Sequence, residues 1–97
     1  MALYITLYKW TEQGIKNIKD APERIKASAK ALEAVGGKLV SVYLTMGEYD
    51  LVSVNDCPND EIAATMLLNQ AMQGNIRSVT LKAFSLDQFS QIVKKLS

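Results

Sequence analysis

The chain has no histidine, one cysteine and no long apolar run. Without an imidazole there is no histidine ligand for haem, zinc or non-haem iron, and no Ser-His or Cys-His nucleophile pair. A lone cysteine excludes a disulfide within the chain. The first residues, MALYITLYKW, lack the basic start of a signal peptide, and no segment approaches the ~18 apolar residues of a membrane span. We therefore expect a cytoplasmic, soluble protein without metal or haem and without a membrane partner.

Neither sign of charge predominates. Eleven basic and ten acidic residues leave a net charge of +1, which gives no electrostatic reason to bind nucleic acid. The apolar share of 48% is that of an ordinary globular protein. Because a domain below ~50 residues rarely holds a core alone, residues 1–97 are expected to form a single domain.

Alternation of apolar and polar residues predicts the strands, and helical spacing predicts the helices. In the first strand, Leu3, Ile5 and Leu7 share one face. A helix-start signal at Asp20, followed by proline and Glu23, makes Asp20 the expected N-cap of the first helix. Strands are expected at residues 2–9, 38–46, 50–55 and 76–84, and helices at residues 21–35, between 61 and 73, and at 85–96.

The order β-α-β-β-α-β with a C-terminal helix predicts an α+β fold, the ferredoxin-like sandwich whose helices cover one sheet face. If the helices cover the face of Leu3, Ile5 and Leu7, the opposite face carries Tyr4, Tyr8 and Tyr43, more aromatic than a sheet surface left in water needs to be. Two copies that pair these faces would form a dimeric α+β barrel. The alternative is a monomer with an amphipathic outer face.

Four segments resemble the GYD-domain family, which is named after a Gly-x-Tyr-Asp signature. They are KWTEQGIKNIKD at 9–20, GGK at 36–38, GEYDLV at 47–52 and GNIRSVTLKAFS at 74–85. The resemblance covers nearly the whole chain, and it implies membership of the dimeric α+β-barrel superfamily. It implies no activity, because that superfamily includes cofactor-independent oxygenases, haem-handling enzymes and ligand-sensing domains.

Two groups of residues are candidates for a ligand site. The first is the GEYD turn, in which Gly47 and Asp50 suit a hairpin, whereas Tyr49 is not required by a turn; a structural and a ligand-facing role for Tyr49 and Asp50 both stay open. The second is the loop after the first strand. There Trp10 offers a flat apolar wall, with Asn17 and Arg24 as polar anchors, and the alternative is that Trp10 closes the core. Tyr43 joins these candidates from the second sheet face.

The leading hypothesis for function is a small homo-oligomeric module whose barrel binds a small organic ligand. One alternative is a cofactor-independent enzyme, oxygenase- or isomerase-like, that uses tyrosine or aspartate for proton transfer. Another is a purely structural oligomerisation unit. Cys57, which precedes a proline at a helix start, is interpreted as a buried or turn residue because no partner for a nucleophile accompanies it.

Overall fold

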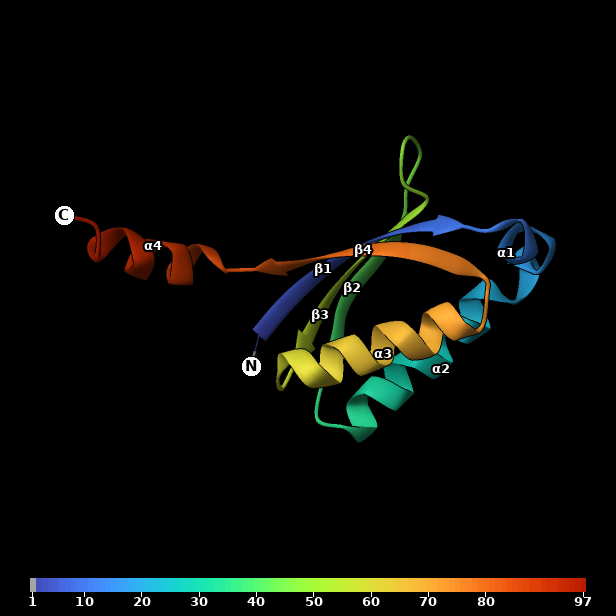
Figure 1. Ribbon diagram of the computed structural model, residues 1–97, viewed down its shortest axis with the longest axis horizontal. Coiled ribbons are helices and arrows are strands. Elements are labelled where there is room, and N and C mark those ends of the chain that lie inside the picture. The colour runs from blue at the N-terminus through green and yellow to red at the C-terminus, as the bar shows by residue number, and fades with distance from the viewer. Residues whose placement is uncertain (1) are drawn as a thin grey trace.

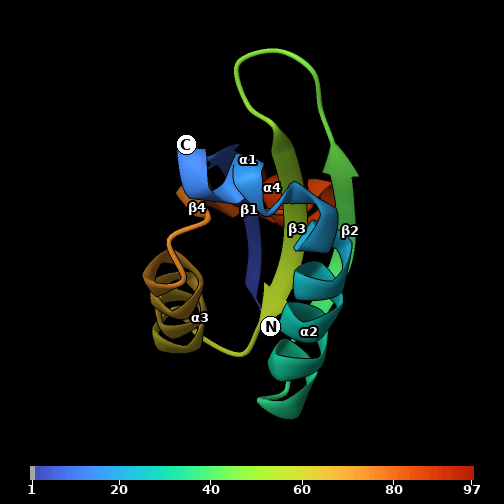
Figure 2. The same ribbon diagram turned by 90° about the vertical axis from the view of Figure 1, so that its right-hand side faces the viewer.

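The computed structural model describes residues 2–97. Its four strands form one antiparallel sheet in the order β2-β3-β1-β4, and α2 and α3 lie side by side against one face of that sheet (Figures 1 and 2). This confirms the predicted α+β, ferredoxin-like arrangement. The elements are β1 (Ala2–Trp10), α1 (Glu12–Lys16), the 3-10 turn η1 (Ile18–Asp20), α2 (Ala21–Ala34), β2 (Lys38–Leu44), β3 (Leu51–Cys57), α3 (Asp60–Met72), β4 (Ile76–Ala83) and α4 (Leu86–Lys94).

Side chains cap the N-termini of three helices, α1, α3 and α4. Ser85 and Gln88 form a capping box at the start of α4. Asn59 caps α3 by accepting a hydrogen bond from the Ile62 amide at 2.9 Å. Asp20 occupies the predicted N-cap position of α2, but its side chain makes no cap hydrogen bond. The 3-10 turn η1 ends at Asp20 and leads directly into α2, so Asp20 already has helical backbone angles and its carboxylate is not placed to cap.

The helices cover the opposite sheet face from the predicted one. Tyr4, Thr6 and Tyr8 lie beneath the helices and are 6%, 1% and 6% exposed. Small side chains on the helices, Ala21 and Ala63 among them, are also buried there and leave room for the tyrosine rings. Each hydroxyl on this face finds a hydrogen-bond partner, which offsets the cost of its burial.

The open face of the sheet is the more apolar one. Strand register places Ile5 between Val54 and Leu81, and it places Leu7 between Val52 and Val79. Val79 and Leu81 are about half exposed, at 48% and 49%. Tyr43 pairs with Val52 and shares this face. An aliphatic surface of this extent is unusual on a sheet that remains in water.

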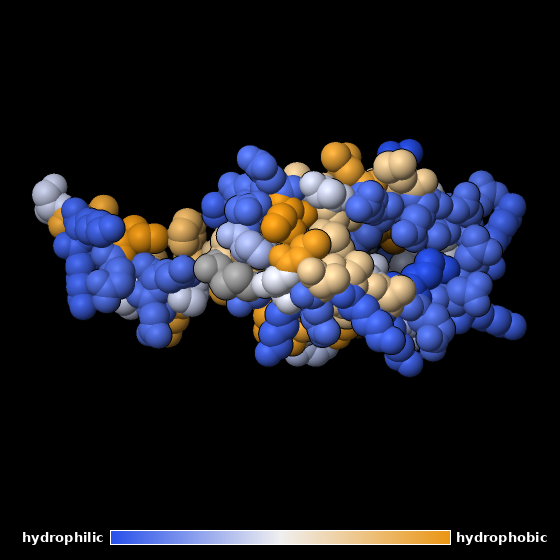
Figure 3. All heavy atoms as spheres, turned by 90° about the horizontal axis from the view of Figure 1, so that it is seen from below, coloured by the Kyte–Doolittle hydropathy of each residue, from blue (hydrophilic) through white to orange (hydrophobic). Residues whose placement is uncertain are grey.

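The C-terminal helix α4 stands away from the rest of the molecule, beyond the end of β4 (Figure 1). Its apolar side chains share one side of the helix and are exposed; they are Leu86, Phe89, Ile92 and Val93. Seen from the helix side, apolar residues also gather over the middle of the molecule (Figure 3). Leu68 and Met72 are the exposed large apolar residues of α3. No helix in residues 2–97 is long and apolar enough to cross a membrane.

Candidate functional site

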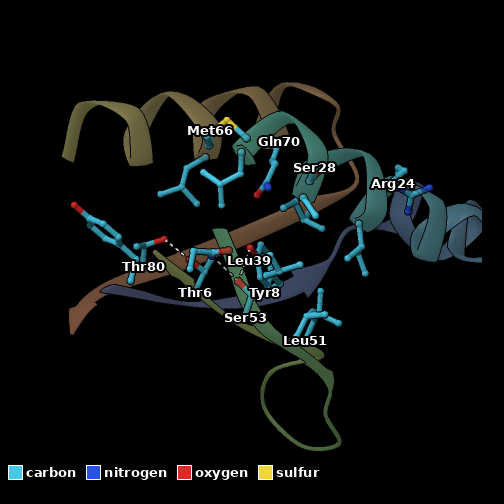
Figure 4. Close-up of a pocket in the computed structure, with 18 of the residues that line it drawn as sticks. Thr6, Tyr8, Arg24, Ser28, Leu39, Leu51, Ser53, Met66, Gln70 and Thr80 are labelled. Carbon is cyan, nitrogen blue, oxygen red and sulfur yellow. Dashed lines mark hydrogen bonds between the residues drawn. The ribbon is translucent and has the colours of Figure 1, made fainter. Parts of the chain in front are cut away.

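A cavity of about 100 Å³ lies between the helices and the sheet (Figure 4). Its roof consists of α2 and α3, and its floor consists of the inward-facing residues of all four strands. Most of the lining is apolar, including Leu32, Leu39, Leu51 and Met66. Ligand sites are commonly concave, mostly apolar and supplied with a few placed polar groups, so the polar part of the lining decides what the cavity can do.

The floor of the cavity carries two short hydrogen-bonded groups. The Thr6 and Thr80 hydroxyls are 3.0 Å apart. The Tyr8 hydroxyl lies 3.0 Å from the Ser53 hydroxyl, which also accepts a 3.0 Å bond from the Asn55 amide nitrogen. Burial raises the pKa of Tyr8, and its hydrogen bonds oppose that rise. The floor is therefore polar but uncharged, and its hydroxyls retain lone pairs for a further donor.

Gln70 of α3 is a polar residue of the roof, as is Ser28 of α2, and the Gln70 side chain points down toward the floor (Figure 4). Its Oε1 atom is buried and has no hydrogen-bond partner. A buried amide left without a partner costs roughly 1–3 kcal/mol. Sequence reasoning missed Gln70, although a signal was present: it follows Ala63 and Met66 at helical spacing and is the polar member of that inward-facing stripe.

Trp10 and Arg24 both line this cavity. The Arg24 Nη1 atom donates a 3.0 Å hydrogen bond to the backbone oxygen of Asn17, while its Nη2 atom is buried without a partner. Asn17 contributes its backbone to this contact and is itself exposed. In Figure 4, Arg24 lies at the α1 end, away from Gln70.

Tyr49 and Asp50 lie in the loop between β2 and β3, which extends beyond the sheet (Figure 2). The Asp50 carboxylate accepts a 3.0 Å hydrogen bond from the Trp10 amide, and the Asp50 amide donates to the Tyr8 carbonyl at 2.8 Å. The Lys9 ammonium sits 5.3 Å from the centre of the Tyr49 ring. Asp50 thus fastens the loop to β1, and neither residue lines the cavity.

Tyr43 lies on the open face of the sheet and is 61% exposed, so it does not line the cavity either. Cys57 is 3% exposed in a core cluster with Tyr4, Leu32 and Ala63. Burial raises the pKa of the Cys57 thiol, which keeps the sulfur protonated and a poor nucleophile.

A second polar cluster ties β1 to the start of α3. The Tyr4 hydroxyl donates a short hydrogen bond to the Asp60 carboxylate, and Lys82 of β4 donates to the same carboxylate at 3.0 Å. The hydrogen bond to Asp60 raises the pKa of Tyr4 to about 12. The bonds from Tyr4 and Lys82 lower the pKa of Asp60. A tyrosine that holds its proton this firmly is poorly suited to act as a general base near neutral pH.

The Tyr4–Asp60 contact predicts a loss of stability in alkaline solution. Because the folded-state pKa of Tyr4 is raised above its ordinary value of 10.0, this contribution is complete below pH 10 and is lost as the pH rises toward about 12. We expect the decline in urea-unfolding midpoint across this interval to be shallower in Tyr4→Phe than in wild type. Tyr43→Phe, which alters an exposed ring, is the control, and equal slopes in all three proteins would contradict the assignment.

Comparison with known proteins decides the family. The model of the GYD domain matches residues 4–93. The chain belongs to the GYD-domain family. A GYD relative from Thermus thermophilus, described as a glutamine synthetase and cystathionine beta-lyase binding protein, is 32% identical over 84 residues, which are 86% of this chain and 88% of the relative.

Two solved structures share the fold of this GYD domain. The crystal structure of TTHA0845, also from Thermus thermophilus, superposes with a TM-score of 0.54 at 22% identity, covering 88% of this chain and 95% of that one. FFRP-DM1 superposes with a TM-score of 0.58 at 16% identity, covering 87% of this chain and 100% of the other. At these identities the likeness concerns the fold alone.

Proposed function

We propose that this GYD domain is a homo-oligomeric, single-domain binding protein that docks on a metabolic enzyme. The observation that carries the proposal is the near full-length relative at 32% identity, which is described as a binding protein for two enzymes. The exposed apolar surfaces of this chain support it, since a binding protein needs surfaces of this kind for its partners.

Self-association is proposed to use the open sheet face. Its two apolar rows, centred on Ile5 and Leu7, suit a second sheet packed against them face to face, as in a dimeric α+β barrel. A two-fold axis would let each copy cover the same surface on the other.

Enzyme docking is proposed to use α4. A nine-residue helix is too short to be stable on its own in water, so its apolar side requires a partner surface. The body of this chain leaves that side exposed, and an amphipathic helix laid in a groove is a common mode of protein recognition. Phe89, at the middle of the apolar side, is the expected anchor.

The test is direct binding to purified glutamine synthetase and cystathionine beta-lyase from the source organism, measured by biolayer interferometry with serum albumin as the negative control. We expect wild type to bind at least one enzyme and Phe89→Asp to weaken that binding roughly 30-fold, as for the loss of a hot spot worth about 2 kcal/mol. Gln91→Ala, on the polar side of α4, should bind like wild type. No binding by wild type would refute the function, whereas unchanged binding by Phe89→Asp would refute only the surface.

A second candidate function is the binding of a small organic ligand without metal or haem. The helix–sheet cavity and the unpartnered amide of Gln70 favour it. The enzymatic alternative has less support, because the Asp50 carboxylate is engaged by the Trp10 amide and Tyr4 holds its proton tightly. A purely structural role would require the cavity to stay empty of any organic molecule.

A further inference from the structure

We infer that the helix–sheet cavity selects a small neutral molecule with a carboxamide or hydroxyl group, which Gln70 recognises. This inference rests on the second candidate function, that the protein holds a small ligand. It assigns the chemistry of that ligand from the groups that face the cavity and from those that do not.

The roof supplies the recognition group. The Gln70 Oε1 atom is an acceptor without a partner, and the amide as a whole makes no hydrogen bond within residues 2–97. A primary amide presents both an acceptor oxygen and donor N–H groups, so it pairs best with another amide or with a hydroxyl. Pairing would recover the cost of burying Gln70 and give the ligand a fixed orientation.

The floor is complementary to the remainder of such a ligand. Thr6, Ser53 and Thr80 are already hydrogen-bonded within the sheet, so they need no ligand. Their hydroxyls keep spare lone pairs, and the two threonines also carry methyl groups. Leu39, Leu51 and Met66 supply apolar walls around them. A short hydrocarbon portion can therefore lie across the floor while its polar end meets Gln70.

The charged side chains nearest the cavity lie at its two ends. Asp60 and Lys82 pair with each other at the Tyr4 end. Arg24 lines the opposite end, where its Nη1 atom donates to the backbone of Asn17 and its Nη2 atom has no partner. An ion placed beneath Gln70 would lose its hydration without gaining a counter-charge, which is far more costly than burying a neutral group. Beneath Gln70, this arrangement disfavours carboxylates and ammonium ions.

The volume limits the size of the ligand. A closed apolar cavity of roughly 150 Å³ holds benzene, and the cavity here measures about 100 Å³. The enclosed part of the ligand is therefore about the size of a four-carbon amide or alcohol. Such a small molecule makes few contacts, so we expect dissociation constants on the order of millimolar, which correspond to about 4 kcal/mol.

The experiment uses four probes with one hydrocarbon chain and different head groups: butyramide, 1-butanol, butyrate and butylammonium. Each is titrated into the ¹⁵N-labelled full chain, and the shifts of the Gln70 side-chain amide and of backbone amides around the cavity report binding. We expect the two neutral probes to bind and the two ions to bind at least tenfold more weakly. Gln70→Leu should weaken the binding of butyramide at least tenfold, whereas Asn69→Leu, on the exposed side of α3, should leave it unchanged.

Each contrary outcome has its own meaning. If no probe binds, the cavity is not a ligand site and the second candidate function fails together with this inference. If butyrate binds as tightly as butyramide and Arg24→Gln abolishes its binding, a small ligand is held but the neutral class is wrong. If butyramide binds equally to wild type and Gln70→Leu, the role of Gln70 is wrong. Gln70→Met, which keeps the length of the side chain, provides the same test should the leucine variant fold poorly.

Discussion

Replacing Gly14 by alanine is expected to destabilise the protein, although alanine normally favours a helix by ~1 kcal/mol over glycine. Gly14 is buried in α1, and a Cβ atom there would lie 2.0 Å from the Asn75 carbonyl oxygen. That oxygen accepts a 3.0 Å hydrogen bond from the Thr11 amide, so it cannot move away without breaking the contact between α1 and the loop before β4. We expect a loss of roughly 3 kcal/mol, or a fall in Tm of roughly 12–24 °C.

Thermal and urea unfolding measure this effect. Lys16→Ala, an exposed change in the same helix, should stay within about 0.5 kcal/mol of wild type and serves as the control. A Gly14→Ala protein as stable as wild type would show that the close approach to Asn75 is absent in solution. Because α1 directly follows Trp10, which lines the cavity, the same loss of stability should also weaken the binding of any ligand that contacts Trp10.

The sequence predicted the elements well, because their signals are local. Alternation marked the strands, and helical spacing marked the helices, including the C-terminal one that the Ser85–Gln88 capping box begins. The segment around Gly14 was expected to be a loop after the first strand, but α1 and η1 occupy it. These two short elements depend on distant contacts such as that between the Thr11 hydroxyl and the Gly74 carbonyl, at 2.5 Å, which no local pattern reveals.

The assignment of sheet faces failed for a physical reason. In an isolated sandwich, the most aliphatic face is expected beneath the helices. Here the helices cover a face of tyrosine and threonine whose hydroxyls pair within the fold, and the aliphatic face is left open. The prediction placed the aliphatic face beneath the helices and left the tyrosine face for pairing between copies, whereas an aliphatic open face suits a face-to-face pair of sheets better. A β-bulge between Leu39 and Ser41 also shifted the alternation of β2, which simple counting could not anticipate.

The candidate site was predictable only in part. Trp10 and Arg24 were chosen for a loop near the mouth of the fold, and the structure places both at the cavity. Gln70 was overlooked because a lone polar residue in an apolar stripe looks like a helix surface position until its partners are known. Asp50 was chosen for its chemistry, yet its contacts with Trp10 and Tyr8 depend on how the loop folds back onto β1.

Leu81→Lys is expected to abolish self-association. Leu81 is 49% exposed on the open face and pairs with Ile5 at the centre of an apolar row, so its replacement should disturb the folded monomer little. In a face-to-face pair of sheets the lysine ammonium would be buried without a counter-charge. A penalty of at least ~3 kcal/mol corresponds to a dissociation constant raised more than roughly 100-fold. Sedimentation velocity over a range of protein concentrations measures it.

The matched control is Leu68→Lys, which makes the same substitution at an exposed position on the outer side of α3 and should leave the association unchanged. If Leu81→Lys associates like wild type while Leu68→Lys does not, the copies pair through the helix layer instead of the sheet. If wild type itself sediments as a monomer at micromolar concentration, pairing of the sheets is refuted. The open face would then be free to meet another protein, and the Leu81→Lys variant, tested against the same enzymes as Phe89→Asp, would show whether it does.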